Sequence, residues 1–403
     1  MKVKTRSILT FFLIFFFISA ACEKRKAGWS GTIELEYGVK LVKNPKEPVY
    51  GEILFDLEED LSIGNEDDEN YIFYLKDYYR AKNVALDSKE NIYVLDNGSF
   101  RIQKFDGKGH YLQTIGRKGQ GPGEFTLPTY FYIDDQDNLY ILDGRKIQVF
   151  DSNGEFRKSI LLEVSIQNFS VTSEGHILAR INPSMERKKA IVRMDKEGKI
   201  LSYVAEFSDV KPAIRTGGTK GSHILFTTFH DYSPRPCFSS VNGQSFSYGF
   251  PLKYELLIVD NMGNLMLKIQ KEEKPQSISQ REKRKIIDEL IESISNRGRM
   301  WPEGVLEEAC QFPSYRPFFD RILNDDKGRI YVRKVTSVLN RTGKIEFDIF
   351  NKSGYYLYKT TMPFSPEIIK NGYLYDQHTS EETGEVRIRR YKVKNWNQLK
   401  ERI

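Results

Sequence analysis

Short apolar runs separated by polar turns fill most of the chain. Five of the turns share the pattern D/N-x-x-G, and each has alternating apolar and polar residues on either side. In such a turn the Asp or Asn side chain accepts hydrogen bonds from the backbone, and the glycine adopts a positive φ. Each pattern therefore predicts a β-hairpin. The five turns are residues 106–109, 151–154, 195–198, 260–263 and 351–354.

A second predicted hairpin precedes most of these turns, which makes the repeating unit four strands long. The clearest copies of this preceding hairpin are residues 84–96, 132–143, 171–180 and 323–333. The first residues of successive D/N-x-x-G turns lie 45, 44, 65 and 91 residues apart. A period of about 45 residues with four short strands is typical of a β-propeller blade.

The two long intervals indicate insertions of about 20 and 45 residues. We expect the first insertion at residues 229–250, between the second and third strands of the fourth blade. The second lies between the fourth and fifth blades and contains a predicted helix within about 275–298, because apolar residues recur there at helical spacing. Ser277 and Gln280 are the expected capping box, and Gly298 the expected end.

The ends of the chain are expected to close the ring. Residues 371–377 and 386–393 predict a sixth blade that lacks its outer strand. Residues 53–64 contain an L-S-I-G sequence that resembles Q-T-I-G at the end of the first blade, so we expect this N-terminal strand to complete the sixth blade. The predicted fold is all-β: a six-bladed antiparallel propeller closed by an N-terminal strand, with one helical insertion between blades four and five.

A glycine-rich stretch, IGRKGQGPGEFTLP at residues 115–128, raises the possibility of a phosphate-binding loop. It lacks G-x-x-x-x-G-K-[ST] and G-x-G-x-x-G, and it leads into a strand, whereas both phosphate motifs lead into a helix. We therefore interpret it as the connector from blade one to blade two, with Phe125 packed between the blades.

The stretch IYVLDNGSFRIQKFD followed by GRKGQGPGEFTLP resembles the NHL-type repeat. Residues 32–394 as a whole resemble the exported bacterial six-bladed β-propeller lipoproteins of that lineage. The resemblance implies a propeller with binding surfaces, and related propellers include zinc-dependent lyases and metal-dependent lactonases.

The N-terminus has the features of an export signal. Basic residues precede an apolar run that is too short to cross a bilayer, and small residues precede Cys22. We expect residues 1–21 to be removed and Cys22 to be lipidated, which would place the protein on a bacterial membrane, on the periplasmic side or at the cell surface. The alternative is a secreted protein with an exposed N-terminal thiol. Residues 22–31 are the predicted tether, and residues 395–403 a C-terminal tail.

The charge of the chain argues against a nucleic-acid partner. Its formal net charge is +6, and loss of the three basic residues in the signal lowers it to about +3. The expected partners are an envelope protein, a peptide or a glycan, together with the membrane through the lipid anchor.

The aromatic stretch at 229–250 is the candidate binding element. In a propeller the loops between the second and third strands and the connectors between blades lie on one face, here called the loop face, so both insertions are expected there. Aromatic rings beside polar side chains suit recognition of a sugar, peptide or protein. The alternative is a lid that covers blade four. The candidate ligand-binding residues are His230, Tyr232, Arg235, Phe238, Phe246 and Tyr248.

Cys237 and Cys310, one in each insertion, are either a disulfide or two buried thiols.

A catalytic function is weighed against binding and is not preferred. Asp96 and Asp143 are able to ligate a metal, but turn capping explains their recurrence. Of the five histidines we assign His230 and His378 to the loop face, two blades apart, which is a poor zinc site. The sequence shows no nucleophile with a general base placed beside it. We therefore predict no catalytic residues, no metal-binding residues and no cofactor. A calcium ion bound by carboxylates in the central channel remains an alternative. We expect a cell-envelope binding or scaffolding protein, with a metal-dependent hydrolase or lyase as the alternative.

Overall fold

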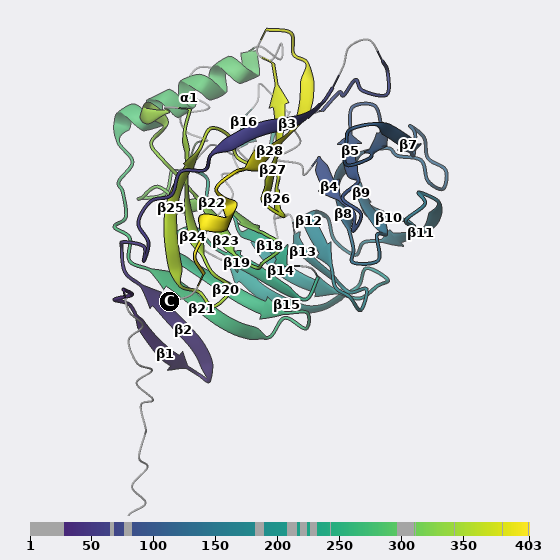
Figure 1. Ribbon diagram of the computed structural model, residues 1–403. Helices are drawn as coiled ribbons and strands as arrows, with labels where there is room; N and C mark the ends of the chain where they lie inside the picture. Colours follow the sequence, from purple (N-terminus) through teal and green to yellow (C-terminus); the bar gives the residue numbers. More distant parts are fainter. Residues whose placement is uncertain are drawn as a thin grey trace, which may run out of the picture.

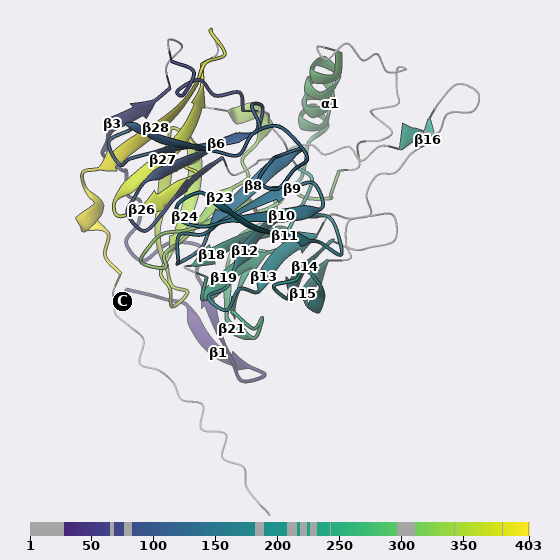
Figure 2. The ribbon, with the colours of Figure 1, turned by 90° about the vertical axis from the view of Figure 1, so that its right-hand side faces the viewer.

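The computed structural model describes residues 28–64, 68–75, 83–181, 189–207, 216–217, 224–225, 232–241, 243–295, 310, 312–341, 343–380, 382–401 and 403. The chain forms a six-bladed β-propeller, as predicted, and its strands are arranged in sheets around a central axis (Figures 1 and 2). Within the part of the chain that the structure describes, no helix is both long enough and apolar enough to cross a bilayer.

The first three blades are four-stranded and follow one another in sequence. Blade one contains β4 (Val84–Leu86), β5 (Ile92–Asp96), β6 (Arg101–Phe105) and β7 (Tyr111–Ile115). Blade two contains β8 (Pro128–Ile133), β9 (Leu139–Asp143), β10 (Lys146–Phe150) and β11 (Phe156–Leu161). Blade three contains β12 (Ile166–Val171), β13 (Ile177–Ile181), β14 (Lys189–Met194) and β15 (Ile200–Phe207). A separate two-stranded ribbon follows, made of β16 (Thr216–Gly217) and β17 (Ile224–Leu225).

The last three blades complete the ring. Blade four contains β18 (Cys237–Val241), β19 (Ser245–Gly249), β20 (Glu255–Asp260) and β21 (Leu265–Lys271). Blade five contains β22 (Phe319–Asn324), β23 (Ile330–Lys334), β24 (Ile345–Phe350) and β25 (Tyr356–Met362), with a short 3-10 helix, η1 (Val338–Asn340), between β23 and β24. Blade six contains β26 (Ile368–Lys370), β27 (Tyr373–Thr379) and β28 (Val386–Val393).

The outer strand of blade six comes from the N-terminus, as predicted. β3 (Leu57–Ile63) pairs antiparallel with β28, and Ile63 lies opposite Ile388. Arg390 reinforces the pairing through two contacts with Asp60, at 2.9 and 3.1 Å. This pairing leaves no open edge between the first and last segments of the ring.

All five D/N-x-x-G turns are hairpins of the predicted kind. In blade two, Asp151 Oδ1 accepts hydrogen bonds from the backbone N–H groups of Asn153 and Glu155, at 3.0 and 2.9 Å. Gly154 has a φ of +80°. The other four turns repeat these contacts and have a glycine with positive φ at the same position.

The segment before β3 runs along the outside of two further blades, which the sequence did not predict. β1 (Thr32–Glu36) and β2 (Val39–Asn44) form a hairpin, and β2 pairs in parallel with β21, so the sheet of blade four has six strands. Beyond it, the backbone N–H of Val49 donates to Tyr356 O at 3.1 Å on the edge of blade five. The N-terminal segment therefore covers the outer strands of blades four, five and six in turn.

The prediction that residues 229–250 are an insertion is wrong. Most of this segment forms β18 and β19, the first two strands of blade four. Phe246 and Tyr248 alternate with serines in β19, and the rings pack between blades, which is why the segment forms a strand. The additional residues instead precede β18, in the connector from blade three.

The predicted helix between blades four and five is confirmed. α1 spans Gln280–Ser295. Its capping box differs from the predicted one: Ser279 Oγ accepts from the N–H of Glu282 at 3.2 Å, and Glu282 Oε2 accepts from the N–H of Ser279 at 2.9 Å. The prediction placed this S-x-x-E pairing two residues too early. Gly298 lies outside the described residues.

The glycine-rich stretch at 115–128 is a connector, as interpreted. Phe125 is fully buried, and its ring centroid lies 5.8 Å from that of Phe150 in blade two. The same hydrophobic cluster includes Tyr93 and Ile102 of blade one. Phe125 therefore joins the cores of the two blades.

The C-terminal tail packs against blade five. It contains a 3-10 helix, η2 (Trp396–Gln398), and Trp396 is 8% exposed. The guanidinium carbon of the buried Arg329 lies 4.2 Å from the centroid of the Trp396 ring, so the tail covers this cation.

Candidate functional site

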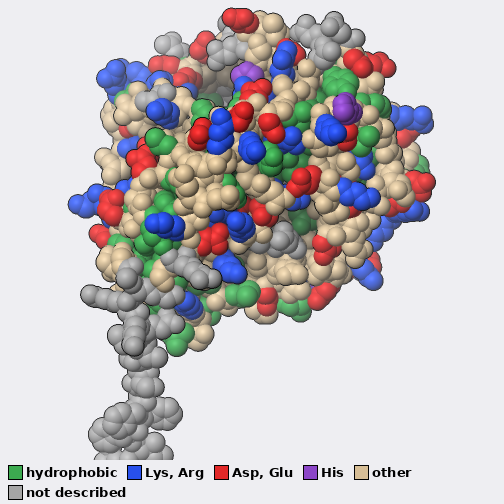
Figure 3. Space-filling model, viewed as in Figure 1, with side chains coloured by type: hydrophobic (Ala, Val, Ile, Leu, Met, Phe, Trp, Pro, Cys, Tyr) green, Lys and Arg blue, Asp and Glu red, His purple; other side chains and the backbone are tan. Residues whose placement is uncertain are grey.

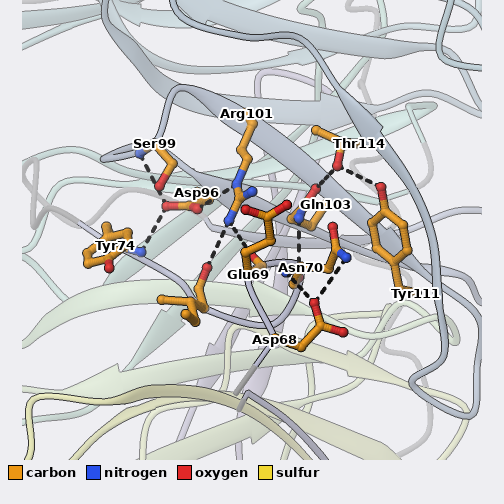
Figure 4. A network of polar contacts seen from close by, with 11 residues as sticks. Asp68, Glu69, Asn70, Tyr74, Asp96, Ser99, Arg101, Gln103, Tyr111 and Thr114 are labelled. Carbon is orange, nitrogen blue, oxygen red and sulfur yellow. Dashed lines mark hydrogen bonds and ion pairs between the residues drawn. The ribbon is translucent and has the colours of Figure 1, made fainter. Parts of the chain in front are cut away.

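Asp96 and Asp143 hold the connectors between blades. Asp96 Oδ1 accepts from the backbone N–H of Tyr74 at 2.9 Å, and its Oδ2 accepts from Arg101 Nε at 3.0 Å (Figure 4). Asp143 repeats the arrangement one blade later and accepts from the N–H of Leu127 at 2.5 Å. Both carboxylates therefore bind the backbone of an incoming connector, which the sequence did not predict. The predicted cap on the following turn is seen at Asp96, whose Oδ1 also accepts from the N–H of Ser99 at 3.3 Å. Among the described residues there is no group of three or more His, Cys, Asp or Glu able to hold a metal ion.

The candidate aromatic residues are largely buried. Phe246 is 0% exposed and Tyr248 is 5% exposed, and Phe238 stacks on Phe246 with ring centroids 5.8 Å apart. A buried ring offers no surface to a ligand, so in this structure these side chains form the core between blades three and four. Arg235 and Phe238 keep partial exposure, and their role in binding stays a prediction. His230 lies outside the described residues.

Tyr232 fastens the loop-face segments together. Its hydroxyl donates to Glu282 Oε1 of α1 at 2.7 Å and accepts from the N–H of Val338 in η1 at 2.9 Å. Ser337 Oγ also donates to Glu282 Oε1, at 2.7 Å. Tyr232, Ile286 and Val338 share a small hydrophobic cluster. The connector before blade four, the helix and a loop of blade five thus form one joined layer. The alternative of a lid over blade four stays a prediction.

Hydrogen bonds hold the Glu282 carboxylate in its charged form. Burial opposes this charge and would raise the pKa, but the donors Ser337, Ser279 and Tyr232 outweigh burial and lower the pKa of Glu282 to about 2. The joined layer is therefore fastened by an ionised carboxylate at neutral pH.

The two cysteines are not joined by a disulfide. Cys237 and Cys310 are both buried, at 5% and 7% exposure, which is the alternative of two buried thiols.

Lys189 of β14 anchors the connector before blade four. Its Nζ donates to Pro234 O at 3.0 Å, and Arg180 Nη1 donates to Pro236 O at 2.6 Å. Burial, followed by the charges of Arg235 and Arg180, lowers the pKa of Lys189 to about 8. Three basic side chains thus meet where the connector crosses blade three.

A pocket of about 740 Å³ opens between blades five and six. Most of its lining residues come from the loop-face halves of the two blades and from the connector that joins them, and Leu57 and Tyr391 extend it toward the other ends of β3 and β28. They are Leu57, Arg321, Arg333, Pro363, Phe364, Ser365, Glu367, Asp376, Gln377, His378, Thr379, Arg389 and Tyr391. The predicted placement of His378 on the loop face agrees with this position.

Each of the three pocket arginines is oriented by its own carboxylate. Arg321 binds Glu367 through two contacts of 3.2 and 3.0 Å. Arg333 binds Asp320 through contacts of 2.6 and 2.7 Å, and Arg389 Nη2 donates to Asp376 Oδ2 at 2.7 Å. These pairs fix the guanidinium planes before any ligand arrives.

Burial shifts the pKa values of charged groups at the pocket. Burial raises the pKa of Asp376, and Arg389 only partly offsets this effect. Burial alone would lower the pKa of Arg333, but Asp320 outweighs it, and the net shift is upward. Asp320 therefore favours the charged form of Arg333, whereas burial favours the neutral form of Asp376.

One donor in the pocket wall has no acceptor. Arg389 Nε is buried and makes no hydrogen bond to any described residue. A buried donor without a partner costs about 1–3 kcal/mol. Such a cost is expected where a site is completed by a bound molecule.

The opposite side of the pocket is apolar. Phe364 of the connector and Tyr391 of β28 lie with ring centroids 4.7 Å apart and their planes inclined by 32°. Leu57 and Pro363 extend this side. The pocket therefore combines an arginine-rich wall with a wall of rings and aliphatic groups.

The central channel beside the pocket is crossed by tyrosines. Tyr132 of blade two hydrogen-bonds to Ser240 of blade four, and burial raises its pKa to about 12. Burial also raises the pKa of the neighbouring Tyr130, which lies within electrostatic range of Arg321 and Glu367.

No pattern in the sequence predicts this pocket. Arg321, Arg333 and Arg389 occupy ordinary strand positions in two blades, and only the ring geometry brings them together. Acidic and basic side chains are also intermixed over the face seen in Figure 3, with no single-sign patch on that face to point to a site.

The architecture is similar to that of proteins with known structures. A Bacteroides fragilis protein described as exported matches with a TM-score of 0.50 and 13% identity, covering 87% of this chain and 100% of that chain. A DUF4221 family member from Bacteroides vulgatus matches with a TM-score of 0.50 and 11% identity, covering 84% and 98%. A Xanthomonas campestris gluconolactonase matches with a TM-score of 0.40 and 11% identity over 83% and 98%, which is too distant to bear on activity. Identities this low indicate a shared fold alone.

No curated protein matches the sequence. One family model does match it, over residues 82–382, and is described as "Domain of unknown function (DUF4934)". The matched region begins just before blade one and ends within blade six, so it covers the first five blades and leaves out β28 and the closing N-terminal strand. The chain therefore belongs to the DUF4934 family.

Proposed function

We propose that the protein is an exported, cell-envelope binding protein that holds a ligand or a protein partner on its loop face, in the pocket between blades five and six. The export-type N-terminus supports this location, as does the similarity to a protein described as exported. The layer formed by Tyr232, α1 and η1 lies on the same face and borders blade five.

The observation that carries the proposal is the set of oriented arginines in an open pocket. Arg321, Arg333 and Arg389 are each held by a carboxylate, and Arg389 Nε has no acceptor. A cavity of about 740 Å³ has the size of a small-molecule site. Polar side chains that are held in place but leave a hydrogen-bond donor without an acceptor are more typical of a binding site than of a structural core.

A pocket-filling variant tests the proposal. Thr379 is exposed and lines the pocket, so Thr379→Trp is expected to fill it without disturbing the core. Thr32→Trp, at an exposed position of β1, is the control. Binding is measured against a panel of small sugars, organic acids and dipeptides. Wild type and Thr32→Trp should bind the same ligands, and Thr379→Trp should bind none of them. All three proteins should have equal melting temperatures. Ligands retained by Thr379→Trp, or none for wild type, would contradict the proposal.

The membrane attachment is proposed to be a lipid on Cys22, which lies outside the described residues. A cysteine directly after the small residues of the signal, followed by a polar tether, supports this assignment. Cys22→Ala should move the protein from the membrane fraction to the soluble fraction. An unchanged distribution between the fractions would refute lipid anchoring and leave the plain secreted form.

The alternative of a metal-dependent hydrolase or lyase has no cluster of ligands in its favour among the described residues. Metal analysis of the purified protein tests it directly. Stoichiometric zinc or calcium would favour the enzyme over the binding protein.

A further inference from the structure

We propose that the pocket between blades five and six is specific for a small, ring-bearing monocarboxylate. This inference rests on the proposed function and specifies the chemical class of the ligand. It combines three properties of the pocket: its charge balance, its oriented donors and the apolar wall that faces them.

The charges around the pocket favour a ligand with at most one negative charge. The three guanidinium groups are paired with three carboxylates, Glu367 and Asp376 in the lining and Asp320 beside Arg333, so the pairs are balanced. A monoanion at the donor edge of Arg389 meets little repulsion from these carboxylates, whereas a doubly charged phosphate or sulfate ester is repelled more strongly.

The donors favour a planar anion. Arginine presents N–H groups in a flat fork that matches the two oxygens of a carboxylate. Asp376 occupies only Nη2 of Arg389, at 2.7 Å, and Nε on the same edge is left without an acceptor. The Arg389 side chain is 21% exposed, but Nε itself has almost no exposed surface, so a carboxylate in the pocket supplies the missing acceptor once the side chain shifts toward the pocket.

The facing wall selects the body of the ligand. Phe364 and Tyr391 pack against each other with ring centroids 4.7 Å apart, and Leu57 and Pro363 lie beside them. Rings and aliphatic groups pack favourably against the flat face of a cyclic body. A free inorganic anion would leave this apolar wall in contact with water, so the pocket is better matched by a carboxylate attached to a ring.

Acids and their neutral amides of the same shape show how much of the binding depends on the negative charge. Benzoate and glucuronate are titrated against wild type and compared with their neutral amides, benzamide and glucuronamide, and with inorganic phosphate. At least one carboxylate should bind at least tenfold more tightly than its amide and than phosphate. Equal binding of acid and amide, or tighter binding of phosphate, would overturn the monocarboxylate inference while leaving a ligand pocket in place.

Two variants on one strand test the role of Arg389. Arg389→Gln should weaken carboxylate binding at least tenfold, and Arg389→Lys, which keeps the charge but loses the planar fork, should also weaken it. Arg387→Gln is the matched control, because Arg387 lies two residues earlier on β28, is 47% exposed and pairs with Glu385 outside the pocket lining. It should change the affinity less than twofold.

The outcomes separate the two proposals. If Arg389→Gln lowers the melting temperature, the affinity of Arg389→Lys for the carboxylate is the deciding measurement. An unchanged affinity in Arg389→Lys would contradict the role of the planar guanidinium group. If neither the carboxylates nor the amides bind wild type, the ring-bearing ligand class is wrong. If Thr379→Trp also fails to remove binding of any small molecule, the proposed pocket function falls as well.

Discussion

Gly198, in the turn between the last two strands of blade three, lies directly against Leu161 at the end of blade two. A Cβ atom placed on Gly198 would lie 2.5 Å from the carbonyl oxygen of Leu161 and 3.0 Å from Cγ2 of Ile160. The turn glycines of two other blades approach side chains of their preceding blade: Gly154 faces Ile115 of blade one, and Gly354 faces Ile269 of blade four. The repeated glycine thus serves both its own turn and the contact with the preceding blade.

Gly198→Ala is therefore expected to destabilise the protein by about 3 kcal/mol, since the alanine is strained at positive φ and also collides with backbone. Gly175 in the same blade is the control: its φ is +82° against +87° for Gly198, and nothing lies within 4 Å of a Cβ there. Gly175→Ala should cost only about 1–2 kcal/mol. Equal losses in the free energy of unfolding, measured by urea denaturation, would show that φ alone explains both glycines.

The blades could be predicted from the sequence because their turns are local. Asp151 and Gly154 lie three residues apart, and the hydrogen bonds that define the turn all fall within that short span. The N-terminal strand β3 could be predicted because it resembles the outer strand of another blade. The connector containing Phe125 could be predicted because neither phosphate motif leads into a strand.

The remaining features depend on contacts between distant residues. β2 pairs with β21 through Lys40 and Leu267, and nothing near Lys40 in the sequence indicates that partner. The first strands of blade four were missed because spacing between turns shows how many residues are added, but not where. The pocket was missed because Arg321 and Arg389 become neighbours only when the ring closes.

A buried ion pair joins blades four and five. Lys271 Nζ lies 3.1 Å from Asp348 Oδ2, and each side chain is only 1% exposed. Tyr254 and Tyr356 also donate to Asp348. Replacing Lys271 with Met leaves a buried carboxylate without its counterion, so Lys271→Met is expected to cost about 3–5 kcal/mol.

The control for this pair is Lys43→Met. Lys43 lies 2.7 Å from Glu34, but the two side chains are 43% and 49% exposed, so the loss should stay below about 1 kcal/mol. Adding Asp348→Asn to Lys271→Met should recover part of the stability by removing the stranded charge. A double variant no more stable than Lys271→Met would show that the tyrosines, rather than the ion pair, dominate this cluster.

Ring closure by β3 predicts a different response to two truncations. A chain that starts at residue 65 loses β3 and the segment along blades four and five, which exposes the edges of β28 and β21. It should lose the cooperative unfolding transition seen by circular dichroism. A chain that starts at Gly28 keeps every described strand and should melt as the full mature chain does. A cooperative transition in the shorter chain would contradict closure by β3.

Glu282 gives the joined layer of the loop face a defined pH dependence. Its folded-state pKa is lowered to about 2 from an ordinary value of 4.5, so its contribution is fully present above pH 4.5 and is lost as the pH falls toward 2. A shift of this size corresponds to a contribution on the order of 3 kcal/mol. The free-energy difference between wild type and Glu282→Gln should be constant from about pH 5 to 8 and shrink below that range, when measured by urea denaturation at each pH. Glu289→Gln on the same helix, where Glu289 is 38% exposed, is the control and should show a smaller difference at neutral pH. A Glu282 difference that persists at pH 2 would mean that shape, rather than the charge of the carboxylate, holds Tyr232 and η1 to the helix.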